Sequence, residues 1–282
     1  MKILRTKDAV KSFCQNLIYG KLSIGFVPTM GALHKGHLEL VKYAKENTDS
    51  VIVSIFVNPT QFNNTDDFEK YPKTLDKDLE LLNNFKVDAV FVPDIQEVYP
   101  LVPTIKLDFG ALERVLEGAF RPGHFNGVGI VVSKLLNIVK PHKAFFGQKD
   151  LQQVAIIKTL VRDFSFDVEI VVVPTVRDRD GLALSSRNLR LQPKDREKAL
   201  ILYRSLFFAK AELLNGRSWL DIRTKVEADF SLLPDVKLEY FELVHSEQML
   251  LLDVLQPELP QSICVAAFVG EVRLIDNISV NH

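Results

Sequence analysis

Two histidines and two glycines lie within seven residues of the stretch PTMGALHKGHLEL, at positions 31 to 37. An apolar run precedes the stretch and an amphipathic segment follows it, so it is predicted to join a strand to a helix. The start of a helix carries unpaired N–H groups and a partial positive charge, which attract phosphate. Gly31 and Gly36 let the main chain approach a bulky ligand. His34 and His37 share one helical face if the first turn includes both, and their imidazoles can donate hydrogen bonds to phosphate oxygens.

Three further segments carry polar groups that suit an anionic ligand with hydroxyls. FVNPTQF holds Asn58 and Gln61, whose amides both donate and accept hydrogen bonds, although Asn-Pro is also an ordinary turn. FFGQKDLQQV holds Lys149, a point charge for phosphate, and Asp150, whose structural role would be to cap the next helix. DGLALSSRN offers two hydroxyls and a guanidinium that can surround phosphates, or a serine-capped helix start with a solvated arginine: Ser185, Ser186 and Arg187.

Short, nearly continuous apolar runs alternate with amphipathic segments through the first two-thirds of the chain. Continuously apolar strands are typical of a parallel sheet covered on both faces, so we expect a Rossmann-like, doubly wound α/β domain. Such a sheet binds ligands beyond the carboxyl ends of its strands, where the polar segments above lie. The predicted strands span residues 22–27, 51–57, 89–92, 144–146 and 168–173, and the predicted helices span 38–47, 74–84, 128–139 and 151–163.

The pattern changes after residue 188, where two helices are followed by three strands. The helices are predicted at 192–215 and 218–232, and the strands at 237–244, 264–269 and 272–275. We therefore expect two domains: residues 1–176, a Rossmann-like domain that binds the nucleotide and substrate, and residues 177–282, a smaller α+β domain that acts as a lid. The lid and the loop from Asp180 to Arg187 are expected to close over the site and exclude water.

Composition excludes several classes of function. Lys and Arg number 35 against 36 Asp and Glu, so the basic excess of a nucleic-acid-binding surface is missing. No apolar run approaches the ~20 residues that cross a bilayer, and the N-terminus lacks the pattern of a signal peptide. Cys14 and Cys264 are too few for a disulfide framework, so we expect buried thiols in a cytoplasmic protein.

The segment HKGH resembles the His-x-Gly-His signature of nucleotidylyltransferases and class I aminoacyl-tRNA synthetases, and the longer string PTMGALHKGH resembles the pantoate–β-alanine ligase family. The resemblance continues in order through FVNPTQF, YPKT, LEGAFRPGHFNGV, KLLNIVKP, FFGQKDLQQ and DGLALSSRN. It implies an enzyme that ligates pantoate and β-alanine through a pantoyl adenylate, with ATP and Mg²⁺, and that forms a homodimer. No protein ligand of the metal is predicted.

The resemblance also assigns residues. It implies that His34, His37, Lys149, Ser186 and Arg187 act in catalysis, and that pantoate or β-alanine is bound by Gln61, Gln153, Asn58, Tyr71 and Arg121, with Glu117 nearby. The ATP-binding set adds Met30, Gly31, Ala32, Leu33, Lys35, Gly36, Gly147, Gln148, Asp150, Val176, Leu184 and Ser185. Gln148, Leu184 and Asn126 depart from the usual family residues, Glu, Met and a basic side chain.

Two alternatives stay open from the sequence. One is another nucleotidyl transferase that releases an adenylated product. The other is a nucleotide-sensing module without catalysis, against which the intact His34, His37, Lys149 and Arg187 argue. A truncated aminoacyl-tRNA synthetase is disfavoured, because no basic anticodon-binding module is visible.

Overall fold

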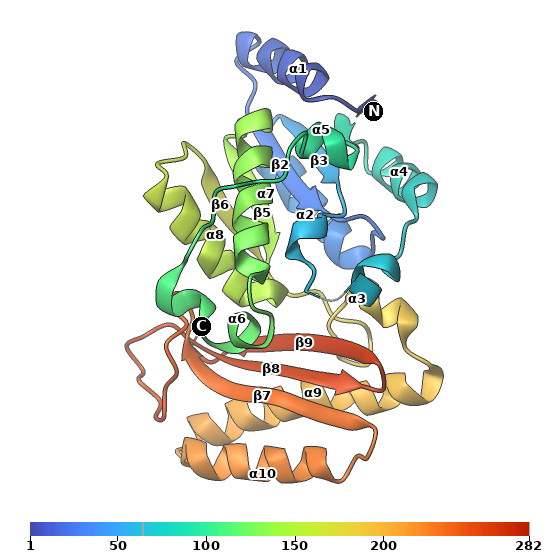
Figure 1. Ribbon diagram of the computed structural model, residues 1–282. Coiled ribbons are helices and arrows are strands. Elements are labelled where there is room, and N and C mark those ends of the chain that lie inside the picture. The colour runs from blue at the N-terminus through green and yellow to red at the C-terminus, as the bar shows by residue number, and fades with distance from the viewer. Residues whose placement is uncertain (64, 282) are drawn as a thin grey trace. The chain divides into compact units, whose positions relative to one another are not determined.

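The computed structural model describes residues 1–63 and 65–281 (Figure 1). The chain forms two compact units, each built from several segments. The first unit contains Met1–Phe109, Arg121–Gly147 and Ile156–Pro174, and the second contains Gly110–Phe120, Gln148–Ala155 and the chain from Thr175 onward. The last passage between the units, at Pro174, lies two residues before the predicted domain boundary.

The first unit is built on a six-stranded parallel sheet with strand order β1-β4-β3-β2-β5-β6. Every neighbouring pair is parallel, as the apolar runs predict. The chain fills one side of β2 with β3 and β4 and then the other side with β5 and β6, so the topological switch point lies between β2 and β5. The strands are β1 Lys2–Leu4, β2 Ile24–Thr29, β3 Ser50–Ile55, β4 Ala89–Phe91, β5 Lys143–Gly147 and β6 Glu169–Val173.

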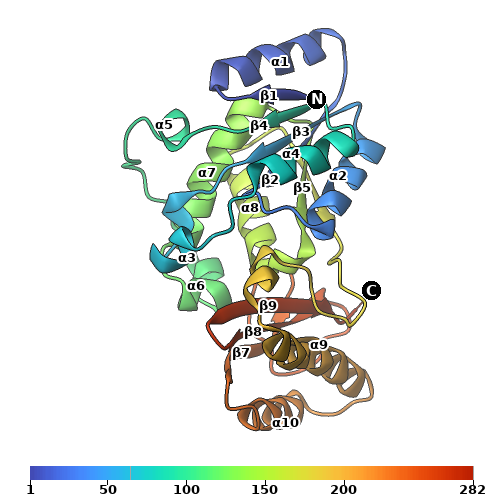
Figure 2. The ribbon, with the colours of Figure 1, turned by 90° about the vertical axis from the view of Figure 1, so that its right-hand side faces the viewer.

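Helices connect these strands and cover the sheet (Figures 1 and 2). α2 packs on β2 and β5, whereas α7 packs on β2 and on α1. Apolar side chains from both layers form the core, among them Val27, Val41 and Phe145. The helices are α1 Lys7–Tyr19, α2 Lys35–Asn47, α3 Thr65–Glu69, α4 Leu75–Asn84, α5 Ile95–Val98, α7 His124–Val139 and α8 Leu151–Asp163, with a 3-10 turn η1 at Pro59–Gln61.

The second unit is an antiparallel sheet of β7 (Val236–His245), β8 (Gln261–Val269) and β9 (Val272–Ser279). Two helices, α9 (Pro193–Leu214) and α10 (Trp219–Ser231), pack on one face of this sheet (Figure 1). Alternate residues of β8 point into the core between sheet and helices, because successive side chains of a strand face opposite sides of its sheet. That core includes Leu202, Leu206, Val226, Phe241 and Val265.

The opposite face of the three-stranded sheet is covered by segments that come from early in the chain. These are η2 (Gly110–Glu113), α6 (Leu116–Phe120) and the first turn of α8. Leu116 and Ala155 pack there on Tyr240, Cys264 and Ala266. The excursion of 110–120 and 148–155 into the second unit was not predicted, because their apolar residues do not reveal which sheet they cover.

The doubly wound sheet and the smaller α+β unit agree with the predicted fold class. The short edge strand β1 and helix α1 were not predicted. None of the helices in the described part of the chain is long and apolar enough to span a membrane.

Candidate active site

The two histidines cap the helix that follows β2. α2 begins at Lys35 with His34 as its N-cap, three residues earlier than the predicted start of the helix. The Nδ1 atom of His34 accepts a hydrogen bond from the Gly36 N–H at 3.1 Å, and Nδ1 of His37 accepts from the His34 N–H at 3.3 Å. Their rings lie with centroids 4.0 Å apart. The spacing of three residues is that of a capping box, so the motif satisfies helix N–H groups with imidazole nitrogens.

These caps indicate which tautomer each ring adopts when it is neutral. A ring nitrogen that accepts a backbone N–H carries no proton, so each neutral imidazole holds its proton on Nε2. The first turn of α2 contains no acidic residue, so the helix itself places no carboxylate at its positive end. Two Nε2–H donors at the positive end of a helix suit an oxyanion such as phosphate.

A buried carboxylate holds the turn that leads into this helix. Asp78 of α4 is 1% exposed, and its two oxygens accept the N–H groups of Ala32 at 2.9 Å and Leu33 at 2.8 Å. The turn needs this support because Ala32 adopts a left-handed conformation with φ of 49°, and Gly31 one with φ of 82°. A Cβ at Gly31 would lie 3.1 Å from an oxygen of Asp78. Asp78 was not predicted from the sequence.

Asn58 and Gln61 lie on the turn that follows β3. Asn58 is 1% exposed, and its Nδ2 donates to Gln61 Oε1 at 3.1 Å and to Gly127 O at 3.2 Å. The Tyr99 hydroxyl donates to Asn58 Oδ1 at 2.9 Å. Gln61 also donates from Nε2 to the sulfur of Met30 at 3.1 Å, so the predicted pantoate residue and the predicted ATP residue lie in contact. The amide of Asn58 is engaged by protein groups, which favours a role in orienting Gln61.

Helix α7 supports the same turn from the other side. A Cβ at Gly127 would lie 2.2 Å from Thr60 O, so only glycine permits this approach of helix to turn. The His124 ring contacts Gln61 O at 2.8 Å, and Arg121 Nη1 lies 3.1 Å from His124 Nε2. Arg121 is therefore brought next to the Gln61 turn.

Two further residues named in the sequence analysis lie in this unit: Tyr71, assigned to substrate binding, and Asn126. Tyr71 is buried and packs edge-on against Phe62, with ring centroids 5.8 Å apart. Asn126, which departs from the family pattern, accepts the Leu107 N–H on Oδ1 at 2.9 Å. The side chain of Asn126 thus has a structural partner of its own.

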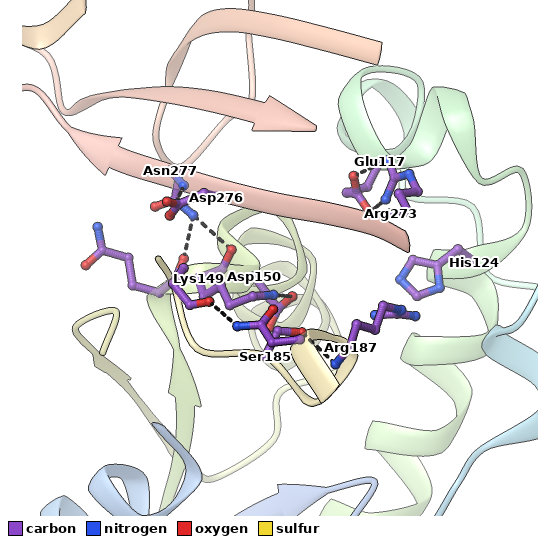
Figure 3. Close-up of polar contacts among 12 residues, drawn as sticks. Glu117, His124, Lys149, Asp150, Ser185, Arg187, Arg273, Asp276 and Asn277 are labelled. Carbon is purple, nitrogen blue, oxygen red and sulfur yellow. Dashed lines mark hydrogen bonds and ion pairs between the residues drawn. The ribbon is translucent and has the colours of Figure 1, made fainter. Parts of the chain in front are cut away.

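The segment GQKD continues from β5 into a 3-10 turn, η3 (Gln148–Asp150), which belongs to the second unit (Figure 3). Lys149 Nζ lies 3.4 Å from Asp150 Oδ1. At Gly147 a Cβ would meet no atom of residues 1–63 and 65–281 within 4 Å, so there is open space beside the main chain. Gln148 donates from Nε2 to Ser279 Oγ at 2.9 Å, which gives the departure from glutamate a partner on β9.

The first turn of α8 carries two adjacent glutamines that differ in burial and in hydrogen bonding. Gln152 is 4% exposed and accepts the Glu117 N–H at 2.9 Å, while its Nε2 donates to Leu112 O and Val115 O. Gln153 is only partly buried, and its side chain makes no hydrogen bond to any residue in the described chain. Because Gln153 is partly exposed, its amide is open to solvent or to a ligand.

The segment DGLALSSRN begins as a hairpin. Leu184 N–H donates to Val176 O at 3.0 Å, and Arg177 pairs with Ala183. Gly181 has φ of 96°, and a Cβ there would lie 2.4 Å from the Tyr203 ring, so conformation and packing both require this glycine. The chain then enters η4 (Ser186–Arg190), where Ser185 Oγ accepts the Arg187 N–H at 3.2 Å (Figure 3).

Glu117 belongs to a buried ionic cluster. Arg273 donates to its two carboxylate oxygens at 2.8 and 2.7 Å, and the Tyr240 hydroxyl donates to Oε1 at 2.8 Å (Figure 3). Burial raises the pKa of Tyr240 well above its usual value, and the neighbouring Glu117 charge adds to that shift. This cluster joins α6 to the three-stranded sheet, which gives Glu117 a structural role that the sequence did not reveal.

Comparison with known proteins identifies the family. The profile described as Pantoate-beta-alanine ligase matches residues 2–279. The chain belongs to the pantoate–β-alanine ligase family. Pantothenate synthetase from Thermotoga petrophila is 45% identical over 278 residues, 98% of this chain and 99% of that protein. Pantothenate synthetase from Bacteroides fragilis is 46% identical over 280 residues, 99% of this chain and 98% of the relative.

Solved structures of the same family superpose on the chain. Pantothenate synthetase from Thermus thermophilus matches with a TM-score of 0.92 and 39% identity, and the match covers 100% of both chains. Pantoate-beta-alanine ligase from Francisella tularensis, complexed with "Beta-gamma ATP and Beta-alanine", matches with a TM-score of 0.82 and 39% identity over 99% of this chain and 98% of that one. The predicted family, fold class and activity are confirmed: the chain is an ATP-dependent ligase that makes pantothenate from pantoate and β-alanine.

Proposed function

We propose that this ligase works in two steps that its own residues support. In the first step the pantoate carboxylate attacks the α-phosphorus of ATP and expels pyrophosphate. In the second the β-alanine amine attacks the carbonyl of pantoyl adenylate and releases AMP. A carboxylate needs this activation because oxide is a poor leaving group, whereas AMP leaves readily. The β-alanine and nucleotide named for the Francisella tularensis structure support this pair of ligands.

The paired imidazoles are the observation that carries the mechanism. His34 and His37 hold their protons on Nε2, because each Nδ1 accepts a backbone N–H. We assign both to the triphosphate, where neutral donors stabilise the charge that develops as pyrophosphate leaves. His37 acts by hydrogen-bond donation rather than as an imidazolium, since a protonated Nδ1 would lose its bond to the His34 N–H.

The remaining phosphate contacts are assigned to the second unit. Lys149 and Arg187 offset the charge of the triphosphate and the departing pyrophosphate, the Ser186 hydroxyl donates a hydrogen bond to them, and Asp150 reaches the ribose. No group of three or more metal-ligating side chains occurs among the described residues. Mg²⁺ bound together with ATP would be held chiefly by the phosphates and would offset part of their charge. The other residues that contact ATP are Met30, Gly31, Ala32, Leu33, Lys35, Gly36, Gly147, Gln148, Val176, Leu184 and Ser185.

Pantoate recognition is assigned to two amides. Gln61 and Gln153 bind its hydroxyls and carboxylate, and an analogue without a hydroxyl would leave a buried amide unpaired. Asn58 orients Gln61 through the 3.1 Å bond between their amides. Tyr71 and Arg121 complete the surroundings of pantoate and β-alanine. Their neighbours Phe62 and His124 hold both side chains in place.

Several assignments concern the whole protein. We propose residues 1–176 as the nucleotide- and pantoate-binding domain and residues 177–282 as a lid. We propose a homodimer in the cytoplasm, where reducing conditions keep the buried Cys14 and Cys264 as free thiols. Sedimentation at several protein concentrations tests the dimer.

Exchange of labelled pyrophosphate into ATP tests the first step. With pantoate and without β-alanine, we expect exchange, and addition of β-alanine should then yield AMP and pantothenate. Exchange without a response to β-alanine would instead indicate an enzyme that releases an adenylated product. An absence of pantoate-dependent exchange would contradict the mechanism.

Two histidine variants test the role of the imidazoles. His37→Ala should slow pantoate-dependent exchange ~10²–10³-fold, because a preorganised donor contributes ~3–4 kcal/mol to the transition state. His34→Asn keeps a strong N-cap residue but removes the Nε2–H donor, so it should retain stability and still lose activity. If His34→Asn kept the wild-type rate, the cap alone would explain His34.

A further inference from the structure

Strand β9 touches both segments of the second unit to which phosphate binding is assigned. Asn277, which is 3% exposed, donates from Nδ2 to Gln148 O at 3.0 Å and to Lys149 O at 2.9 Å (Figure 3). The Gln148 side chain also donates to Ser279, so η3 is attached to β9 both through its main-chain carbonyls and through a side chain. Lys149 therefore extends from a turn whose carbonyls are held by a buried amide.

The neighbouring residue of β9 holds the hairpin. Arg177 donates to both carboxylate oxygens of Asp276, at 2.5 Å from Nη1 and 2.9 Å from Nη2. The same guanidinium donates to Gly181 O at 3.1 Å and to Asn277 O at 3.1 Å, so it spans the strand and the hairpin turn. Its planar group also lies over the Tyr203 ring, 5.3 Å from the centroid. An arginine with this many fixed partners is rigid.

We propose that Asp276 and Asn277, acting through Arg177 and the carbonyls of Gln148 and Lys149, are positioning residues that set the Lys149 turn and the Ser185–Arg187 segment in register for the triphosphate. The inference rests on the proposed function of those two segments. Two adjacent residues of one strand hold two turns that are almost thirty positions apart in sequence. A small displacement of either turn would misalign its phosphate-binding groups, whereas the sheet itself would persist.

Asn277→Asp tests this inference with almost no change in volume. A carboxylate cannot donate, so the variant sets two carbonyl oxygens against a negative charge. We expect kcat/KM for ATP to fall roughly 10–100-fold, since a ~1 Å misplacement near a reacting group can cost ~10²-fold. The KM for ATP should rise while the KM for β-alanine stays within about 2-fold. A loss of folded protein alone would lower kcat and leave both KM values unchanged.

Asn281 provides a matched control. Its Nδ2 also donates to two carbonyls, Pro257 O at 3.0 Å and Leu259 O at 2.6 Å, in a loop that holds no predicted site residue. Asn281→Asp should leave the KM for ATP within about 2-fold of wild type. An equal rise in both variants, or no rise in Asn277→Asp, overturns the inference.

Arg177→Lys gives a second test if Asn277→Asp fails to fold. One ammonium keeps the charge beside Asp276 but cannot span Asp276, Gly181 O and Asn277 O together. Its control, Arg223→Lys, makes the same exchange at the Glu227 and Glu242 pairs of the α10 surface. We expect a raised KM for ATP in the first variant alone, and equal values in both would overturn the inference. Pantoate-dependent exchange by the wild-type protein is measured in parallel, because its absence would refute the proposed function instead.

Discussion

Replacing Asp78 with asparagine removes the charge that holds the turn before His34. The carboxylate serves three donors: the N–H groups of Ala32 and Leu33, and the Thr74 hydroxyl at 3.2 Å. Asparagine offers one oxygen and an NH₂ group, so one backbone N–H faces another donor. A hydrogen bond to a charged group contributes ~1.5–3 kcal/mol, and an unsatisfied buried donor costs ~1–3 kcal/mol. We expect the free energy of unfolding to fall by about 2–4 kcal/mol.

The same substitution should slow the chemistry. The bonds that Asp78 accepts hold the turn at the left-handed Ala32, two residues before the N-cap of α2, and the substitution removes one of them. A turn that relaxes displaces the His34 and His37 donors from the departing phosphates, and ~1 Å of displacement lowers the rate ~10²-fold. Urea unfolding followed by circular dichroism measures the stability, and pantoate-dependent pyrophosphate exchange at low denaturant measures the rate.

Asp76→Asn is the control for Asp78→Asn. Asp76 is exposed in the same first turn of α4, so its loss removes a favourable charge from the helix start and alters stability by only ~0.3–1 kcal/mol. If Asp78→Asn matched Asp76→Asn in both stability and exchange rate, the buried carboxylate would not be what holds the turn, and the explanation of the left-handed residues would be wrong.

Three other changes test the packing. Arg273→Met leaves Glu117 buried without its cation, so the free energy of unfolding should fall by ~3–5 kcal/mol in urea titrations. Gly127→Ala forces a methyl group against Thr60 O, and we expect ~1–3 kcal/mol of destabilisation together with a raised KM for pantoate. Burial raises the pKa of Cys14 from 9.0 to about 11. At a pH between those values the Cys14 thiol ionises only in the unfolded chain, so stability should fall as the pH rises from 9 to 11. The fall should be less steep in Cys14→Ala, which keeps only the contribution of groups such as Cys264, whose pKa burial also raises.

The parallel sheet was predictable because its strands carry their own signal. β3 is buried at all six positions, and such a continuous apolar run is typical of a central parallel strand. β1 spans three residues at the sheet edge and is mostly exposed, so its sequence lacks that signal. Helix α8 was predicted with its correct bounds from periodicity alone. Its division between two units was not predictable, because periodicity does not say what a helix packs against.

Sequence position and residue type point to candidate chemical groups more readily than to the groups that hold them. His34, Lys149 and Arg187 come after β2, β5 and β6 in the sequence, and segments that follow strands are where such a fold is expected to bind ligands. Asp78 looks like one of several acids on an amphipathic helix, and only its burial reveals its role. Asn277 lies in a strand whose alternation does not distinguish a positioning amide from a surface one. Their partners are distant in sequence, and the sequence alone gives no distance between them.

The capping geometry explains how one motif can supply both the acceptors that cap a helix and N–H donors for a ligand. A capping box needs an acceptor at the N-cap and another three residues later, and imidazole Nδ1 supplies both in HKGH. Serine or glutamate would cap the helix equally well, but neither would present a second, opposed N–H donor beyond the cap. Histidine caps with one ring nitrogen and donates with the other, on the opposite side of the ring. The three-residue spacing thus follows from helix geometry, and the choice of histidine agrees with the phosphate contact that we propose for this helix end.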